Sequence, residues 1–230
     1  MAIFDHDDIC HHERLASQLW FMESLPYVDI VDSAITYFSE VKDLATASRV
    51  LCHPCEDAVI KTKLLRICPI GHPSAMSRRN LFTDAGGYLA EFSRAEDYAL
   101  WCRAAPPGKR FANLEESLMF YRLHPARTSQ VQCQRMAVKD IEIKRLCIRA
   151  LLGGDDASLA ELLCLGLYHK SNKSLAGALT GLIPVILKFG QRMPCPNTSA
   201  DLVGQVLAQR FNDAHSSVSG GYWWVLLSLR

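Results

Sequence analysis

The order of strand-like and helix-like segments in the first hundred residues is the feature that most restricts the fold of this chain. Residues 1–4 predict a strand. An acidic turn links it to HERLASQLWFMESLP, residues 12–26, where the apolar spacing predicts a helix ending before the proline. Residues 28–38, VDIVDSAITYF, are rich in β-branched and aromatic side chains and predict a second strand. This alternation indicates an α/β fold.

The next segments continue that pattern. Residues 73–78 predict a short strand, and Gly86 with Gly87 predicts a sharp loop where backbone can approach a ligand closely. Residues 96–105 predict a helix with two acids in its first turn, where the helix dipole favours negative charge. Residues 116–124 predict another extended run, so the α/β character continues to about residue 124.

The character of the sequence changes near residue 130. Helical patterns follow at residues 138–152, 158–169 and 201–211, separated by Gly, Pro, Asn and Ser. We therefore expect two parts: an α/β domain of residues 1–130 and a mostly α-helical C-terminal region of residues 131–230.

Composition limits the partners and the compartment. With 230 residues and a net charge of +1, the chain has no general electrostatic attraction to nucleic acid, and we expect no nucleic-acid partner. Its nine cysteines are odd in number and mostly lie in apolar segments, which indicates a reducing compartment. The start of the chain lacks the pattern of a secretory signal, so we expect a cytoplasmic protein.

Residues 175–190, LAGALTGLIPVILKFG, form the most apolar late segment. Pro184 interrupts it, and it falls short of the ~20 residues that a spanning helix needs. Two interpretations stay open: a helix packed on the protein itself, or a helix on the inner face of a membrane.

The acidic turn, FDHDDIC at residues 4–10, is the first candidate site. In an extended segment Asp5 and Asp7 point to the same side, and carboxylate oxygens suit Mg²⁺ or Mn²⁺. The alternative is that Asp8 caps the following helix and its neighbours gain from the helix dipole.

A second metal pattern lies further along the chain. Cys52, Cys55, Cys68 and His72 have a spacing that a structural zinc site could use. A cysteine-rich chain also produces such spacings by chance, and both interpretations stay open.

Several ordered blocks resemble family 2 glycosyltransferases. Residues 4–35 resemble the middle of such enzymes, where an apolar strand ends in D-x-D-D and an E-R-L, Q helix, a proline and a V-D-x-V-x-S strand follow. The later blocks match in order: HPSAMSRR at 72–79, AGGYLAEF at 85–92, AEDYALWCRAA at 95–105, FANLEESLMFYRLHP at 111–125, and Ser129. The resemblance covers about residues 1–130.

The resemblance implies a partial GT-A-like sheet flanked by helices. It also implies an inverting enzyme that uses Mn²⁺ or Mg²⁺ to move a sugar from a nucleotide diphosphate to an acceptor hydroxyl. The acceptor would be a glycan or a lipid-linked sugar in glycan or cell-surface polysaccharide synthesis. By position, Asp5 would face the donor ribose, Asp7 would bind the metal, and Asp8 would belong to the same donor site. The metal would stabilise the leaving diphosphate.

The same resemblance assigns the acceptor side. Asp97 matches the general base that takes the proton of the acceptor hydroxyl, and Gly86, Gly87 and Glu96 are acceptor-side candidates. Capping of a helix by acids in its first turn is the alternative for Glu96 and Asp97. His124 matches a second metal ligand or diphosphate contact, although an isolated histidine can also be structural.

Other conspicuous side chains have simpler interpretations. Tyr98 and Trp101 are expected to pack in the core. Arg78, Arg79 and Arg122 are expected to be solvated or to pair along helices, although an arginine can also approach a phosphate.

The chain departs from the resemblance at its start. Family 2 enzymes place a nucleotide-binding half before the acidic strand, whereas this sequence begins inside that strand. A second function therefore stays open: a truncated, non-catalytic remnant or interaction module. On either interpretation we expect self-association or a partner that supplies the missing half.

Overall fold

The computed structural model describes residues 1–65, 67–93, 95–105, 108–123 and 133–152, which belong to one compact unit, Met1–Cys164. Along the chain the elements are β1 (Ile9–Cys10), α1 (Arg14–Ser24), β2 (Ile30–Phe38), the 3-10 helix η1 (Val41–Thr46), β3 (Val50–Leu51), α2 (Asp57–Leu64), β4 (Met76–Ser77), α3 (Arg79–Asp84), the 3-10 helix η2 (Ala90–Phe92), α4 (Glu96–Ala104), β5 (Phe111–Arg122) and α6 (Cys133–Leu152). The helices predicted at 158–169 and 201–211 and the apolar run at 175–190 lie outside these residues.

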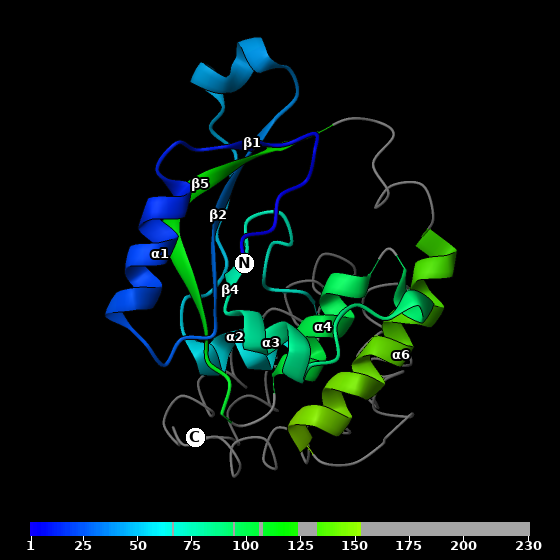
Figure 1. Ribbon diagram of the computed structural model, residues 1–230. Coiled ribbons are helices and arrows are strands. Elements are labelled where there is room, and N and C mark those ends of the chain that lie inside the picture. Colours follow the sequence, from blue (N-terminus) through cyan, green and yellow to red (C-terminus); the bar gives the residue numbers. More distant parts are fainter. Residues whose placement is uncertain (66, 94, 106–107, 124–132, 153–230) are drawn as a thin grey trace, which may run out of the picture. The chain divides into compact units, whose positions relative to one another are not determined.

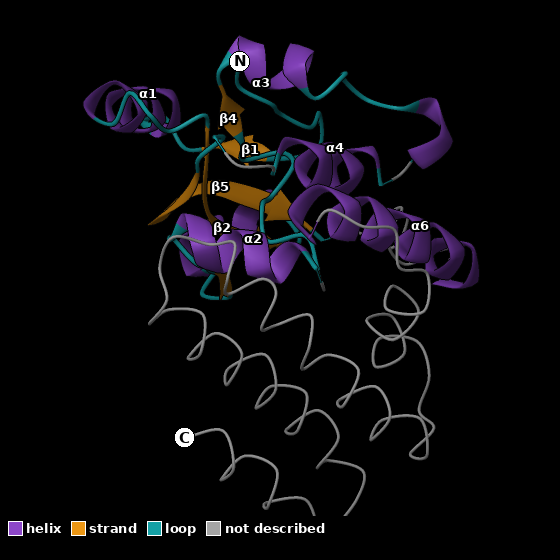
Figure 2. Cartoon of the chain, turned by 90° about the horizontal axis from the view of Figure 1, so that it is seen from below, coloured by secondary structure: helices purple, strands orange, loops and turns teal. Residues whose placement is uncertain are grey.

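A five-stranded sheet forms the centre of this unit (Figure 1). The strand order is β1-β5-β2-β3, and β4 also pairs with β2. The central pair, β2 with β5, is parallel, and the other pairs are antiparallel. The strands run between α1 and α2 in Figure 2. The α/β fold with helices flanking a sheet is confirmed.

Strand boundaries differ from the sequence predictions near the acidic turn. The strand predicted at 1–4 is reduced to a bridge between Ala2 and Met76, supported by the Ile3 N–H, which donates to the Ala75 carbonyl at 2.9 Å. Regular pairing begins only after the acids, at β1. The strand predicted at 116–124 begins earlier, at Phe111, because β2 pairs with it along its whole length.

Helix α1 forms where the apolar spacing predicted it, but it turns an unexpected face inward. Its buried residues are Arg14, Gln18 and Met22, which recur every four residues and so share one face. Leu15 and Trp20 are 54% and 69% exposed. The pattern therefore predicted the helix but not the face that packs on the sheet.

Backbone carbonyls explain this orientation. The Arg14 guanidinium donates to the carbonyls of Ile3 and Ala75 and to the Gln18 side chain, at 2.8 to 3.3 Å. The Gln18 amide donates to the Ser74 carbonyl at 2.7 Å. Buried polar groups are tolerated when their hydrogen bonds are satisfied. Arg14 and Gln18 thus hold the chain before the acidic turn against the loop before β4.

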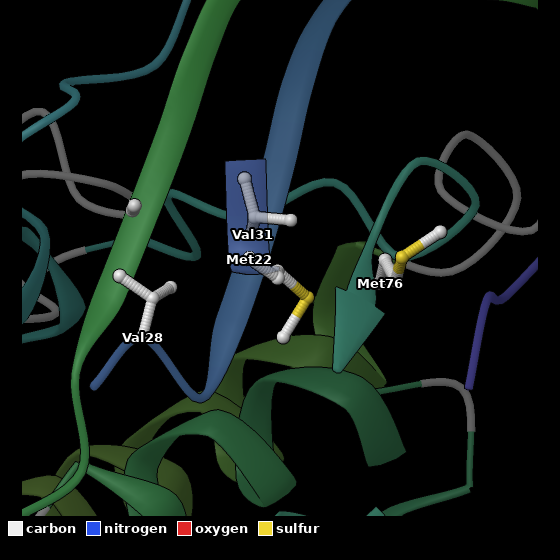
Figure 3. Close-up of a cluster of buried hydrophobic side chains, with 5 residues drawn as sticks. Met22, Val28, Val31 and Met76 are labelled. Carbon is white, nitrogen blue, oxygen red and sulfur yellow. The ribbon is translucent and has the colours of Figure 1, made fainter. Parts of the chain in front are cut away.

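An apolar cluster completes the contact between α1 and the sheet (Figure 3). Met22 of α1 packs with Val31 of β2 and Met76 of β4, and Val28 and Ala112 close the cluster. Burying a side chain of this size contributes about 1.5–3 kcal/mol. The cluster fixes the distance between α1 and the strands.

Helices α4 and α6 lie side by side in Figures 1 and 2, and a disulfide joins Cys102 to Cys147 between them. The cysteine spacing did not predict this pairing. Trp101 is fully buried and the Tyr98 hydroxyl donates to the Leu64 carbonyl at 2.6 Å, so the packing role expected for both aromatic residues is confirmed. Within the described part of the chain, no helix combines the length and the apolar character needed to cross a bilayer.

Candidate active site

The acidic turn lies between the Ala2 bridge and β1. Asp5 and Asp7 are half-buried, and Asp8 is only 8% exposed. The Asp8 Oδ1 atom accepts the backbone N–H of Arg122 at 2.9 Å. Helix α1 has Glu13 at its N-cap and no side-chain cap bond, so Asp8 anchors the turn to β5 instead of capping α1.

Asp8 is also electrostatically unusual. Burial raises its pKa from 3.8 to about 6, the Arg122 N–H opposes the rise, and the negative charges of Asp7 and Asp5 add to it. Its Oδ2 atom is buried and has no hydrogen-bond partner among the described residues. The turn therefore concentrates negative charge that a cation would stabilise.

The first turn of α4 supplies the second group of acids. Ala95 occupies the N-cap, so neither Glu96 nor Asp97 is the capping residue. Burial raises the pKa of Asp97, while the charge of His72 and backbone N–H groups at the helix start oppose the rise and Glu96 adds to it. A carboxylate whose pKa is raised is a stronger proton acceptor for catalysis. This environment fits a general base.

His72 lies between the two acidic groups. Its Nδ1 atom is 3.6 Å from Oδ1 of Asp5, and its Nε2 atom is 2.9 Å from the hydroxyl of Tyr88. Burial lowers the pKa of His72, but the interaction with Asp5 and the charges of Asp97, Asp5 and Glu96 together outweigh burial and raise it. The neighbouring carboxylates thus favour the protonated form of this imidazole.

The predicted glycine loop lies beside this imidazole. Gly86 and Gly87 have φ angles of 76° and 64°, which favour glycine. The Arg103 guanidinium of α4 donates to the carbonyls of Ala85 and Gly87 and fixes the loop. Tyr88 follows directly, so the loop presents an aromatic hydroxyl to His72.

Burial and neighbouring acids raise the pKa of Tyr88 to about 12, the acids being Asp97, Glu96 and Asp5. Tyr88 therefore stays protonated at neutral pH. Acids of the acidic turn and of the start of α4 thus raise the pKa values of both His72 and Tyr88, and these two side chains contact each other beside the glycine loop.

The arginines mostly have structural roles. Arg78 donates to the carbonyls of Val28 and Met22, both at 2.8 Å. The Arg122 guanidinium stacks over the Phe38 ring at 5.3 Å. Arg79 is exposed, as expected for a solvated side chain.

The zinc pattern does not assemble. Cys68 donates to the Ile70 carbonyl, Cys52 is exposed, and His72 contacts Asp5 and Tyr88. In the described ranges, three potential ligands come within 4.8 Å of one another at His11, His12 and Glu13. His124 lies outside the described residues, so its metal role stays a prediction.

Sequence reasoning did not find the roles of His72 and Tyr88. Each lies inside a block quoted for the resemblance, HPSAMSRR and AGGYLAEF, and that placement was the available signal. Their contact joins segments that are separate in sequence, which periodicity does not reveal.

Comparison with solved structures finds a similar architecture. The fold is similar to that of S. aureus TarS, residues 1–349, solved in complex with UDP-GlcNAc. The TM-score is 0.51 at 13% identity, covering 93% of this chain and 64% of that one. At this identity the similarity establishes the fold alone.

Sequence comparison identifies glycosyltransferase relatives. An uncharacterized glycosyltransferase of Haemophilus influenzae is 26% identical over 190 residues, 82% of this chain and 60% of that protein. The amylovoran biosynthesis glycosyltransferase AmsE of Erwinia amylovora is 32% identical over 119 residues, 52% of this chain and 43% of that protein. The O-antigen biosynthesis glycosyltransferase WbnJ of Escherichia coli is 26% identical over 152 residues, 63% of this chain and 58% of that protein.

The chain spans less than two thirds of the length of each of these relatives. No protein-family model matches it. The chain is therefore related to glycosyltransferases of polysaccharide biosynthesis, and its own activity is inferred below.

Proposed function

We propose that this protein is a metal-dependent, inverting glycosyltransferase of family 2 that moves a sugar from a nucleotide diphosphate to an acceptor hydroxyl. One observation carries the proposal: Asp5 of the acidic turn contacts the His72 imidazole, and the negative charges of the acids of α4 raise the pKa of the same imidazole. The relatives named for amylovoran and O-antigen biosynthesis support a glycan or lipid-linked acceptor. Such an acceptor would bring the protein to the inner face of a membrane.

The acidic turn fits a divalent cation. Its side chains offer carboxylate oxygens, and the Oδ2 atom of Asp8 is buried without a hydrogen-bond partner in the described part of the chain. Mg²⁺ and Mn²⁺ commonly take only one or two carboxylates from the protein and complete their shell with water and phosphate. Asp7 would hold the ion, which would neutralise charge on the leaving diphosphate. Asp5 would contact the donor ribose.

Asp97 would act as the base on the acceptor side. Its carboxylate takes the proton of the acceptor hydroxyl as that oxygen bonds to the anomeric carbon. The bond from the anomeric carbon to the diphosphate breaks at the same time, and the nucleoside diphosphate leaves with the electron pair. An alcohol is a poor nucleophile until its proton is taken, which is why a base is needed.

The experiment begins with a panel of nucleotide sugars, including UDP-GlcNAc, with Mn²⁺ and with EDTA. Wild-type chain should release nucleoside diphosphate only with the metal. Asp7→Ala should abolish the calorimetric signal of Mn²⁺ with UDP. Asp97→Asn should lower the transfer rate ~10²- to 10⁴-fold while donor affinity stays within a few-fold.

Asp43→Asn, on η1, is the matched control and should behave as wild type. An Asp97→Asn chain with the wild-type rate would exclude Asp97 as the base, and turnover in EDTA would exclude the metal. Donor binding without turnover of any nucleotide sugar in the panel would favour the interaction module instead.

A further inference from the structure

One side chain contacts both sides of the candidate site. Nδ1 of His72 faces Asp5 on the acidic turn at 3.6 Å, and Nε2 lies 2.9 Å from the hydroxyl of Tyr88 beside the glycine loop. The two nitrogens lie on different edges of the imidazole, so both contacts exist at once.

The backbone that carries His72 is firmly held. The Gly71 N–H donates to Oδ2 of the buried Asp32 at 2.6 Å. The Ser74 hydroxyl donates to the Gly71 carbonyl at 3.3 Å, and the Ser74 carbonyl accepts the Gln18 amide. These hydrogen bonds fix the backbone on both sides of His72, and the two ring contacts then orient its side chain.

Tyr88 is fixed from a second direction as well. Its ring meets the Phe82 ring edge-on, with centroids 5.2 Å apart, and the His72 ring at 5.8 Å. The Tyr88 side chain is still 44% exposed, so it borders solvent where an acceptor would approach. The imidazole therefore connects a donor-side carboxylate to an accessible acceptor-side loop.

We propose that His72 is a positioning residue for glycosyl transfer, holding Asp5 for the donor and the Tyr88 loop for the acceptor in one arrangement. The inference rests on the proposed function, which assigns those two sides. The ionised carboxylates of Asp5, Glu96 and Asp97 repel one another and the donor diphosphate. A protonated imidazole among them lowers that repulsion.

Kinetics separate positioning from a merely structural role. Donor hydrolysis, with water as acceptor, reports the donor side, and transfer to p-nitrophenyl glycosides reports both sides. Asp5→Asn should impair hydrolysis, and Tyr88→Phe should raise the acceptor KM with little change in hydrolysis. His72→Gln should impair hydrolysis and also raise the acceptor KM, so that kcat/KM for transfer falls about 10-fold or more. Its melting temperature should stay close to that of wild type.

A double variant gives the sharpest test. Adding Tyr88→Phe to His72→Gln should lower kcat/KM for transfer by less than about a further twofold, because the contact between the two side chains is already lost. If the two substitutions instead lower transfer independently, so that their fold-changes multiply, the proposal is overturned. A His72→Gln chain that loses stability but keeps kcat and KM would overturn it as well. His53→Gln, a half-buried histidine of the loop before α2, is the control and should leave both assays unchanged.

Nuclear magnetic resonance of the ¹⁵N-histidine-labelled chain tests the bridge without turnover. The His72 ring signals are identified by their loss in His72→Gln. Both Asp5→Asn and Tyr88→Phe should shift them, and signals indifferent to both changes would refute the bridge. If the wild-type chain processes no nucleotide sugar, the proposed function fails by itself, and these spectra still decide whether His72 joins the two segments.

Discussion

Asp32 of β2 offers a test of how the core supports the candidate site. Its side chain is fully buried, Oδ2 accepts the Gly71 N–H, and Oδ1 has no hydrogen-bond partner among the described residues. Burial raises its pKa from 3.8 to about 6, although Ser74, backbone N–H groups and the charge of Arg14 oppose the rise. We predict that Asp32→Asn becomes more stable relative to wild type as the pH rises.

The direction follows from linkage. A carboxyl with a higher pKa in the folded state binds its proton more tightly there, so its contribution is most favourable at low pH and is lost as pH rises through the folded pKa. A shift from 3.8 to about 6 corresponds to a cost of about 3 kcal/mol at pH 8 and roughly half of that at pH 5. The amide does not ionise. The stability difference between Asp32→Asn and wild type should therefore grow by roughly 1–2 kcal/mol from pH 5 to pH 8.

Urea unfolding, followed by the fluorescence of the buried Trp101 together with the other tryptophans, measures this difference at both pH values. Any packing cost of the amide is the same at each pH and cancels. Asp8 titrates in both proteins and cancels too. Asp43→Asn is the control and should show no growth. A difference that stays constant between pH 5 and pH 8 would refute a buried, ionising Asp32.

Two further predictions concern elements that support the site. Arg14→Leu should lower the free energy of unfolding by about 2–4 kcal/mol, because buried carbonyls lose their donor, whereas Leu15→Arg should change it by less than about 0.5 kcal/mol. Equal effects in urea unfolding would contradict the orientation of α1. Gly71→Ala should cost about 1–3 kcal/mol, because a Cβ would meet the Ser74 hydroxyl and lie 2.7 Å from Ile35 Cδ1. Gly87→Ala meets no atom within 4 Å and should cost only about 1–2 kcal/mol of backbone strain at its φ of +64°; a larger loss there than at Gly71 would argue against this packing.

The sequence alone predicted most elements near the site. β-branched and aromatic residues placed β2, the apolar spacing placed α1, and the acids with the following prolines placed α4, because these signals are local. The acidic turn and the glycine loop were also found, since charge and glycine content are visible without a fold. The zinc pattern of cysteines and His72 was also found from residue types and spacing, but the fold does not bring these side chains together around one point.

Tertiary structure decided which side chains these elements bring together. In α1, Leu15 stays exposed, and Arg14 faces inward because the carbonyls of Ile3 and Ala75 lie there to accept its hydrogen bonds. His72 meets Asp5 and Tyr88 for a similar reason: the pairing of β4 with β2, and the bridge from Met76 to Ala2, bring the acidic turn beside the loop before β4. Local sequence determines which elements form, whereas contacts between distant segments depend on how the strands of the whole sheet pair. The pKa values of Asp8, His72 and Asp97 follow from the burial and the neighbouring charges that this pairing creates.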